Sequence, residues 1–292
     1  MRRLLPGVTG PTGGPAFTDV LGTCESWADG VAVVRPESGA PVEIPIELIV
    51  SGKPVPPRAS PRLRVSARDA ELHTAALERA VETVALGAWQ LRHEPHPVGR
   101  VRSRFNSCLA MGDPGMALVE AADAVRTFYA ERGRPAQAQV ETGSEVEAEL
   151  VRRGWTPVAG KDSIFLLASI AQVRRRLTAA AVDLAVTTDG PYLSARSAGA
   201  RGEAGVDGDW LGLHGLFVEP AERRRGLARA VVGALLEAGA EQGATTAWLH
   251  VETGNAPALA LYDSLGFVEH HRCRYYDAPP AEPAAPGTAG RI

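Results

Sequence analysis

Hydrophobic and polar positions follow different patterns in the first sixty residues and in the rest of the chain. Between residues 17 and 50, apolar residues come in the short runs FTDVLGTCESW, GVAVVRP and APVEIPIELIV, separated by Asp29-Gly30 and Ser38-Gly39. Short β-forming runs with turn dipeptides between them are typical of small antiparallel sheets. We therefore expect a small β-barrel and its linker at residues 17–62, closed by the proline-rich stretch 53–57.

From residue 63 to residue 277, helical periods alternate with strand-like runs. Apolar residues at helical spacing predict helices over 68–87, 116–132, 145–153, 172–180, 227–242 and 256–265. Runs of β-forming residues predict strands over 88–93, 98–112, 136–141, 162–168, 183–188, 191–198, 201–205, 210–218, 246–252 and 267–276. The pattern predicts an α/β fold in which helices flank a mixed central sheet, and strands 210–218 and 246–252 run parallel through a crossover helix.

The two ends of the chain show neither the helical spacing nor the strand-like runs. Residues 1–16 are rich in Gly, Pro and Thr, and residues 278–292 are rich in Ala and Pro. Such segments bury too little apolar surface to hold a fixed structure, so we expect both to be disordered.

The α/β region also repeats itself. Three motif pairs recur in the same order about 110 residues apart: AERG with AEQG, VETG with VETG, and Gly154-Trp155 with Gly266-Phe267. Self-similarity at this period implies two copies of one unit, which we place at 63–169 and 170–277. The alternative is that two similar α/β units use the same turn residues independently.

Residues 216–228, LFVEPAERRRGLA, have the order of elements that binds a diphosphate. A strand ends, three arginines follow, and Gly226 precedes a long alanine- and leucine-rich helix. The first N–H groups of a helix have no intrahelical partner, and the helix dipole favours an anion there. Basic residues oppose that dipole, so the arginines favour a bound phosphate group over a solvated turn, which is the alternative.

RRRGLA resembles the Arg/Gln-x-x-Gly-x-Gly/Ala signature of the GNAT superfamily of N-acetyltransferases. A second GNAT signature, Asn-x-x-Ala-x-x-Leu-Tyr-x-x-x-Gly-Phe, is similar to the set Asn255, Ala258, Leu261, Tyr262, Gly266 and Phe267. The resemblance covers residues 180–277 best. It implies the GNAT fold and acetyl-CoA as co-substrate without a metal. The first copy has GDPGMA where the second has RRRGLA, so it resembles a degenerate GNAT unit, and we expect one CoA, in the second copy.

In GNAT enzymes the strands that correspond to 210–218 and 246–252 splay apart and hold the donor between them. The resemblance implies that the backbone of Leu216, Phe217 and Val218 binds pantetheine. It places the diphosphate on Arg223, Arg224, Arg225, Gly226, Leu227 and Ala228, and adds Asn255 and Ala258 to the donor site. Asn255 also precedes Ala-Pro, where an asparagine caps a helix, and the two roles are compatible.

For acid–base chemistry the resemblance implies that Tyr262 protonates the leaving thiolate; the alternative is a core tyrosine. His214 is our candidate for the base, because strand alternation places it on the face of Leu216 and Val218. A half-buried structural histidine is the alternative for His214. His250, Glu219 and Glu252 are other candidate bases, and residues 104–107 are candidates for lining the acceptor cleft.

Composition limits the partners and the cellular location to be expected. The net charge of −3 gives no polycation for nucleic acid, and no apolar run approaches a membrane span or a signal peptide. The three cysteines are too far apart for a metal motif. We therefore expect a cytoplasmic monomer or homodimer, without nucleic-acid or membrane partners. Lys53 and Lys161 are the only lysines among 31 basic residues, a bias typical of high-GC, actinobacterial-type genomes.

The expected function is transfer of acetyl from acetyl-CoA to a primary amine, on a small molecule or a protein, by direct attack in a ternary complex. One alternative is acylation of a thiol-precursor amine, since mycothiol synthase also has tandem GNAT units. Another is a CoA-binding sensor without catalysis, with an N-terminal Src-homology-type barrel as its effector. The barrel either docks on its neighbour or recruits a partner.

Overall fold

The structure is a computed structural model and describes residues 1–10, 13–36, 39–53, 61–78, 80–97, 99, 101–177 and 182–280. The chain divides into two compact units, one ending at Arg62 and the other beginning at Leu63. The expected linker lies outside the described residues at 54–60, and the expected tail, residues 278–292, lies outside them beyond residue 280.

The first unit consists of two three-stranded antiparallel sheets. One has the order β2-β1-β6 and the other β3-β4-β5. The strands are β1 (Arg2–Thr9), β2 (Pro15–Asp19), β3 (Thr23–Ala28), β4 (Val31–Arg35), β5 (Val42–Pro45) and β6 (Ile49–Ser51), with the short helix η1 (Ile46–Leu48) before β6. Among the described residues no strand pairing joins the two sheets, so the small β unit expected here is present as two sheets and not as a closed barrel.

The prediction that residues 1–16 are disordered is wrong. β1 lies between β2 and β6 and pairs with both, so its backbone hydrogen bonds are supplied by later segments. The N-terminal amine of Met1 donates to the carbonyl of Val20 at 2.6 Å, which fixes the first residue as well. Composition could not reveal β1, because its order comes from strand partners and not from an apolar period.

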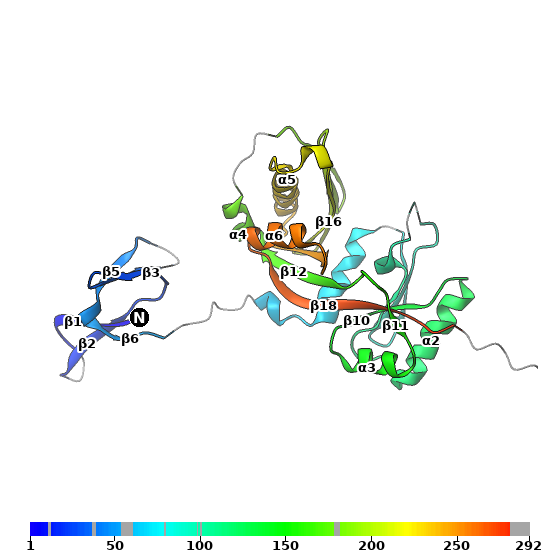
Figure 1. Cartoon of the computed structure of the whole chain (residues 1–292), viewed down its shortest axis with the longest axis horizontal. Helices are drawn as coiled ribbons and strands as arrows, with labels where there is room; N and C mark the ends of the chain where they lie inside the picture. The colour runs from blue at the N-terminus through cyan, green and yellow to red at the C-terminus, as the bar shows by residue number, and fades with distance from the viewer. Residues whose placement is uncertain are drawn as a thin grey trace, which may run out of the picture. The chain divides into compact units, whose positions relative to one another are not determined.

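The second unit is built on one twelve-stranded mixed sheet, with the order β13-β14-β15-β16-β17-β12-β18-β10-β9-β8-β7 and β11 paired to β18 (Figure 1). Its strands are β7 (Glu82–Leu86), β8 (Trp89–His93), β9 (Cys108–Leu109), β10 (Gln137–Glu141), β11 (Thr156–Pro157), β12 (Ser163–Ser169), β13 (Ala185–Asp189), β14 (Tyr192–Arg196), β15 (Ala200–Asp207), β16 (Trp210–Val218), β17 (Thr246–Glu252) and β18 (Val268–Asp277). Its helices are η2 (Pro61–Arg64), α1 (Ala67–Leu72), η3 (His73–Leu77), η4 (Ser103–Phe105), α2 (Leu118–Glu131), α3 (Glu145–Arg152), α4 (Ile170–Arg176), η5 (Pro220–Glu222), α5 (Leu227–Glu241) and α6 (Ala256–Leu265).

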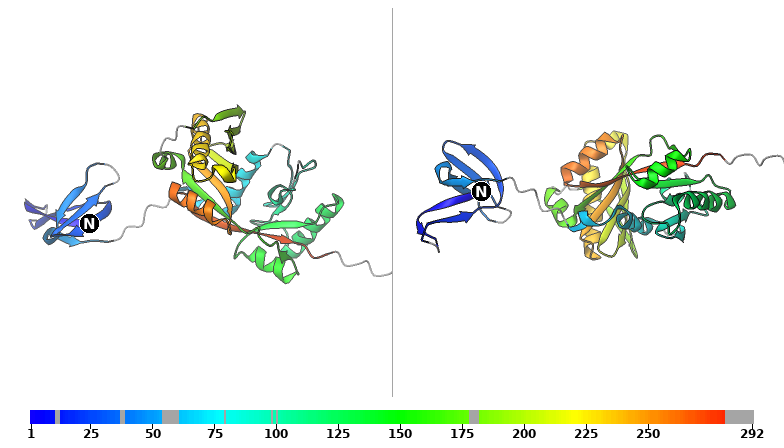
Figure 2. Two further views of the ribbon diagram at one scale, coloured as in Figure 1. Left: turned by 45° about the horizontal axis from the view of Figure 1, so that its top comes forward. Right: turned by 90° about the horizontal axis from the view of Figure 1, so that it is seen from below.

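The internal repeat is confirmed. α2 connects the parallel pair β9 and β10, and α5 connects the parallel pair β16 and β17. Helices α2 and α3 lie at one end of the sheet and α5 and α6 at the other, as both views of Figure 2 show.

The two copies exchange their last strands. β12 belongs to the first copy but pairs with β17 of the second, and β18 belongs to the second copy but pairs with β10 of the first. β12 and β18 then pair with each other in the middle of the sheet. The expected boundary near residue 169 therefore does not separate two folded bodies; it divides a continuous sheet.

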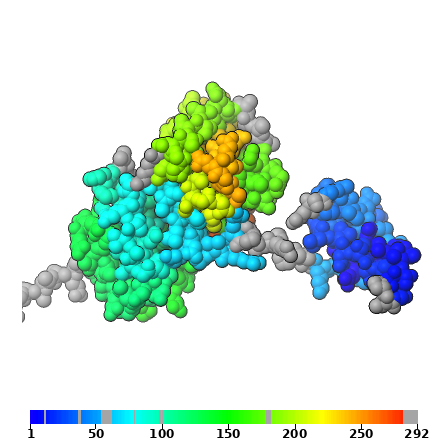
Figure 3. All heavy atoms as spheres, turned by 180° about the vertical axis from the view of Figure 1, so that it is seen from behind, coloured from blue at the N-terminus to red at the C-terminus, as the bar shows by residue number. Residues whose placement is uncertain are grey.

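Helix η3 of the first copy packs on β15 and β16 of the second, and Figure 3 shows the cyan segment beside the yellow one from behind. A Cβ at Gly205 of β15 would lie 2.1 Å from the carbonyl oxygen of Ala76, and one at Gly212 of β16 would lie 2.7 Å from Leu77. The expected helix over 68–87 is correct only as far as Leu77. The residues that follow turn at Gly87, φ +57°, into the β7–β8 hairpin, and apolar spacing alone did not distinguish this edge strand from a helix.

The expected strand over 98–112 is reduced to β9 and the turn η4. Its polar residues, Arg102 to Ser107, do not join the ladder. Instead Arg102, Ser103 and Arg104 line a cavity between the copies, described below, whereas Asn106 and Ser107 hydrogen-bond to Glu94 and Arg92 of the first copy. Within the described residues, no helix has both the length and the apolar character required to cross a membrane.

Candidate functional site

Strands β16 and β17 are paired at only three positions and then diverge. The pairing ends at Gly212 and Trp248, although β16 continues to Val218 and β17 to Glu252. Beyond these residues no β16–β17 pairing is present in the described chain, so the inner backbone edges of both strands face a gap. This is the opening that the sequence resemblance implied.

A cavity of about 760 Å³, here called the helix-side cleft, lies at the carboxyl end of β16. It lies between β16, the N-terminus of α5 and helix α6. Nine of the eleven residues expected to bind the donor line it: Leu216, Phe217, Val218, Arg223, Arg224, Gly226, Leu227, Ala228 and Ala258. The cleft is therefore assembled from both signature segments.

The other two expected residues, Arg225 and Asn255, do not line the cleft. The guanidinium of Arg225 pairs with Glu222, one turn before it. Asn255 accepts a hydrogen bond from the N–H of Ala258 at 3.2 Å through its side-chain oxygen, so it is the N-cap of α6. The capping role expected from the sequence is confirmed.

The backbone of the loop before α5 is arranged to meet an anion. Arg224 has φ +67° and Gly226 has φ +82°, so two residues of the loop are left-handed. Within the described chain, the N–H groups of Leu227, Ala228 and Arg229 have no backbone acceptor. Free N–H groups at a helix N-terminus beside arginine side chains provide a site for phosphate oxygens.

A β-bulge in β16 separates His214 from Leu216. Glu203 faces His214 and Arg201 faces Phe217, so β16 has one residue more than β15 at this point, and Gly215 takes φ +62°. Leu216 consequently packs toward α5, whereas His214 lines a cavity on the opposite face, where η3 lies. The expectation that both face one side is wrong, because strict alternation fails at a bulge.

His214 belongs to a cavity of about 300 Å³ whose lining includes Glu78, Asp189 and Glu203, here called the acidic cavity. Its Nδ1 lies 3.8 Å from Oε2 of Glu203. Burial lowers the pKa of His214 to about 4, against the opposing effect of the Glu203 charge. The imidazole is therefore neutral at neutral pH and able to accept a proton.

A third cavity, of about 330 Å³, lies between the two copies and shares Arg102 with the acidic cavity. It is here called the basic cavity. It is lined by Arg102, Ser103, Arg104, Phe105, Lys161, Ser163, His250, Glu252 and Tyr275. His250 and Glu252 lie on the diverging part of β17. Arg104 and Phe105 were expected to line an acceptor cleft, whereas Lys161 and Ser163 were missed, although Lys161 is one of only two lysines.

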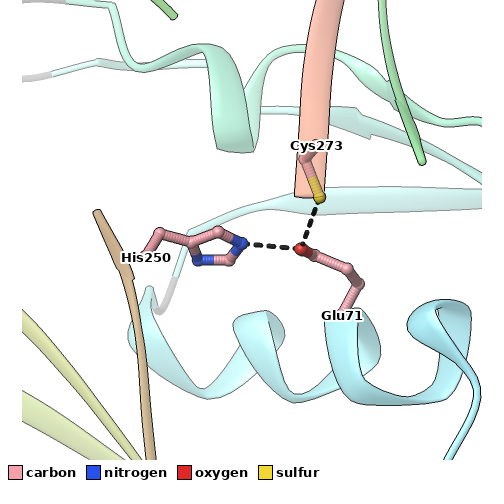
Figure 4. Close-up of side chains that lie close together, drawn as sticks. All are labelled: Glu71, His250 and Cys273. Atoms are coloured by element: carbon pink, nitrogen blue, oxygen red, sulfur yellow. Dashed lines mark hydrogen bonds and ion pairs between the residues drawn. The ribbon is translucent and has the colours of Figure 1, made fainter. Parts of the chain in front are cut away.

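Beside the basic cavity is a buried polar cluster that the sequence did not reveal (Figure 4). Oε1 of Glu71 lies 2.6 Å from Nε2 of His250 and 3.2 Å from both Nε2 of His271 and the thiol of Cys273. Burial alone would raise the pKa of Glu71, but the charges and hydrogen bonds of the two histidines hold this pKa well below its ordinary value.

The ionised Glu71 therefore fixes the ring of His250. One potential ligand atom from each of Glu71, His250 and Cys273 lies within 4.8 Å of the others, so the group also has the composition of a metal site. The 2.6 Å between Oε1 of Glu71 and Nε2 of His250, however, is the distance of a direct hydrogen bond. No sequence signal marked the cluster, because its members come from α1, β17 and β18.

Tyr262 is buried in α6 and contacts Phe267 edge to face, with ring centroids 5.3 Å apart. Burial raises the pKa of its hydroxyl to about 12, so the hydroxyl remains protonated at neutral pH. Its neighbour Leu261 lines the helix-side cleft, whereas Tyr262 is not part of that lining. The tyrosine thus has the protonation state of an acid but lies behind the cleft wall.

The parallel strands β16 and β17 diverge beside the N-terminus of α5, and the facing helix α6 carries the second signature. This arrangement defines a class of protein domain. Residues 168–276 form a GNAT-type acetyltransferase domain. They match the family model described as "Probable histone acetyltransferase Rv0428c C-terminal" over this whole range.

Relatives and solved structures agree with this class. The ribosomal protein bS18-alanine N-acetyltransferase of Escherichia coli (strain K12) is 44% identical over 57 residues, which are 20% of this chain and 38% of the relative. An uncharacterized protein of Mycobacterium leprae (strain TN) is 41% identical over 71 residues, 24% of this chain and 19% of that protein. The chain thus spans well under half of these relatives.

A GCN5-related N-acetyltransferase from Kribbella flavida has a similar fold, with a TM-score of 0.59 at 18% identity. The match covers 74% of this chain and 96% of that one. It therefore extends the structural likeness beyond the residues that the family model matches.

Proposed function

We propose that this protein transfers the acetyl group of acetyl-CoA directly to a primary amine. The observation that carries the proposal is the opening between β16 and β17, with the helix-side cleft at the carboxyl end of β16 and His214, on the diverging part of the same strand, in the acidic cavity on the opposite face of β16. A donor in the cleft and an amine in the acidic cavity would approach each other from opposite faces of the sheet. Alignment of this kind lowers a barrier by up to ~7–11 kcal/mol in favourable cases.

The cleft supplies a separate contact for each part of the donor. The free N–H groups of Leu227 and Ala228, with Arg223 and Arg224, would bind the diphosphate. The inner edge of β16 at residues 216–218 would pair with the amides of pantetheine as an added strand would. Arg225 does not line the cleft and pairs with Glu222, so it is left out of this binding set.

Proton transfer would use the two expected residues in separate roles. The amine nitrogen attacks the thioester carbonyl carbon, the carbon–sulfur bond breaks, and His214 takes the proton that the nitrogen loses. Tyr262 would return a proton to the departing thiolate, which requires its hydroxyl to reach the cleft when the donor is bound. The buried, protonated state of this hydroxyl supports the proposal, and its position behind the wall makes it the step most in need of a test.

CoA release from acetyl-CoA with a panel of amines and amino-terminal peptides tests the activity. Calorimetry of CoA binding separates donor binding from turnover. We expect His214→Gln and Tyr262→Phe to lower kcat by about 10²–10⁴ while CoA affinity stays unchanged. CoA binding without turnover on any amine would instead favour a non-catalytic sensor. Unchanged kcat in Tyr262→Phe would remove that residue from the chemistry.

A further inference from the structure

The charges in the basic cavity do not cancel. Arg102 pairs with Glu78 and Glu94, so its charge is offset. Arg104 has no ion pair with any described residue. In the same part of the chain the ammonium of Lys161 has no ion pair either, and it donates to the hydroxyl of Ser103. The lining contains a single carboxylate, Glu252, which pairs with neither of them.

Several polar atoms of this cavity are buried and have no partner in the described chain. They are Nε of Arg104, Oγ of Ser163 and Nδ1 of His250. The side chain of His250 is 2% exposed and Ser163 is 6% exposed, so water offers them little compensation. Unpaired buried polar atoms each cost about 1–3 kcal/mol. The guanidinium of Arg104 and the hydroxyl of Ser163 therefore favour a ligand that supplies acceptors, whereas Nδ1 of the neutral His250 ring, whose Nε2 donates to Glu71, accepts from a donor.

The position of the basic cavity connects it with the proposed reaction. His250 and Glu252 stand on the part of β17 that diverges from β16, and Arg102 is shared with the acidic cavity that contains His214. One molecule that extends past Arg102 would therefore meet carboxylates at one end and unpaired cations at the other. A molecule with an amine and an anionic group matches this polarity.

We propose that the acceptor amine carries an anionic oxygen group, a carboxylate or a phosphate ester, which Arg104 and Lys161 bind in the basic cavity. This inference rests on the proposed function and names its substrate class. Arg104 presents a planar set of donors suited to two oxygens, and Lys161 adds a point charge. The hydroxyls of Ser163 and Tyr275 are further donors in the same lining.

The test uses matched acceptors. ω-Amino acids with one to five methylenes are compared with their amides, which differ only in charge, and with the phosphate monoesters of the corresponding amino alcohols. We expect the carboxylate or the phosphate ester to exceed its neutral partner in kcat/KM by at least about tenfold at one chain length. The anion with the higher kcat/KM then shows whether the cavity prefers a carboxylate or a phosphate ester. Equal turnover of acids and amides at every length would overturn the proposal.

Variants test whether Arg104 and Lys161 cause the preference for anionic acceptors. Arg104→Gln and Lys161→Gln should each raise KM for the anionic acceptor by about tenfold or more and leave KM for the amide and CoA affinity unchanged. Arg104→Lys should recover part of the loss. Arg175→Gln is the control, because Arg175 is exposed on α4 and lines neither cavity. An equal loss on acid and amide would indicate structural damage and would contradict the assignment.

A binding experiment keeps the two proposals separable. Ligand-observed NMR with the CoA-bound protein measures the acids and their amides without turnover. If no amine is acetylated but the acids bind in an Arg104-dependent manner, the anion site stands and the acetyl transfer fails. If neutral amines are acetylated and acids gain nothing, the acetyl transfer stands and the anion site fails.

Discussion

Replacement of Arg224 tests the loop that precedes α5 in both stability and binding. Among the described residues other than glycine, Arg224 and Asp29 alone have positive φ. The left-handed conformation costs a residue with a Cβ about 1–2 kcal/mol. Strain at a binding loop is expected where the backbone is held in position for a ligand.

Arg224→Gly and Arg224→Ala remove the same guanidinium, but only the glycine relieves the strain. After allowance for the extra chain entropy that glycine loses on folding, we expect Arg224→Gly to be more stable than Arg224→Ala by about 1 kcal/mol. For a domain of this size that difference corresponds to about 2–4 °C in Tm. Urea unfolding and calorimetry measure it.

Both variants should weaken CoA binding to the same extent. Arg224 is exposed, so solvent screening limits its contact with a phosphate to about 1 kcal/mol, or roughly fivefold in Kd. Arg225→Ala is the matched control, since Arg225 is the next residue but does not line the cleft and pairs with Glu222. Titration calorimetry with CoA at low and moderate salt gives the affinities.

Two results would refute this reasoning. Wild-type affinity in both Arg224 variants would show that the side chain makes no contact with the donor. Identical unfolding of the alanine and glycine variants would show that residue 224 is not held in the left-handed conformation.

The remaining predictions concern pH, packing and metal. The pKa of His214 is about 4 in the folded protein and ordinarily 6.5, so the unfolded chain binds more protons between these two pH values. The free energy of unfolding should therefore fall as pH falls from about 6.5 to 4, and it should fall less in His214→Gln. Urea unfolding that gives the wild type and the variant the same pH dependence would contradict the shift. Gly205→Ala should destabilise the domain by about 1–3 kcal/mol or more, because its Cβ would meet a carbonyl oxygen at 2.1 Å, whereas Gly233→Ala in α5 meets only a 3.4 Å contact and should gain about 0.5–1 kcal/mol in the same unfolding assay. Removal of metal by a chelator should leave CoA release unchanged, because direct attack needs no Lewis acid; stoichiometric zinc in the purified protein, with loss of activity on chelation, would make Glu71, His250 and Cys273 a metal site.

The local chemistry of the donor side was predictable from the sequence. The bounds of β16, β17 and α6 agree with the expected ones. Nine of the eleven residues expected to bind the donor line one cleft. A strand, a loop and the first turn of a helix are contiguous in sequence and need no distant partner to adopt their form. Asn255 was likewise recognisable as a cap from its neighbours alone.

Features that depend on distant partners were not predictable. The bulge at Gly215 reversed the expected facing of His214, since it depends on the register with β15. The helix expected over residues 68–87 ended early because residues 82–86 pair with β8. The composition of residues 1–16 predicts disorder, whereas β1 is ordered by its pairing with β2 and β6.

The sequence by itself determined the class of domain and the conformation of the loop proposed to bind the donor, because both depend on short-range motifs whose hydrogen bonds are local. Only the tertiary structure decided how the two copies are joined and what the acceptor meets. The exchange of β12 and β18 brings residues from the first copy, the central strands and β17 around one basic cavity. Charges that lie far apart in sequence become a recognition surface only when the strands that hold them pair.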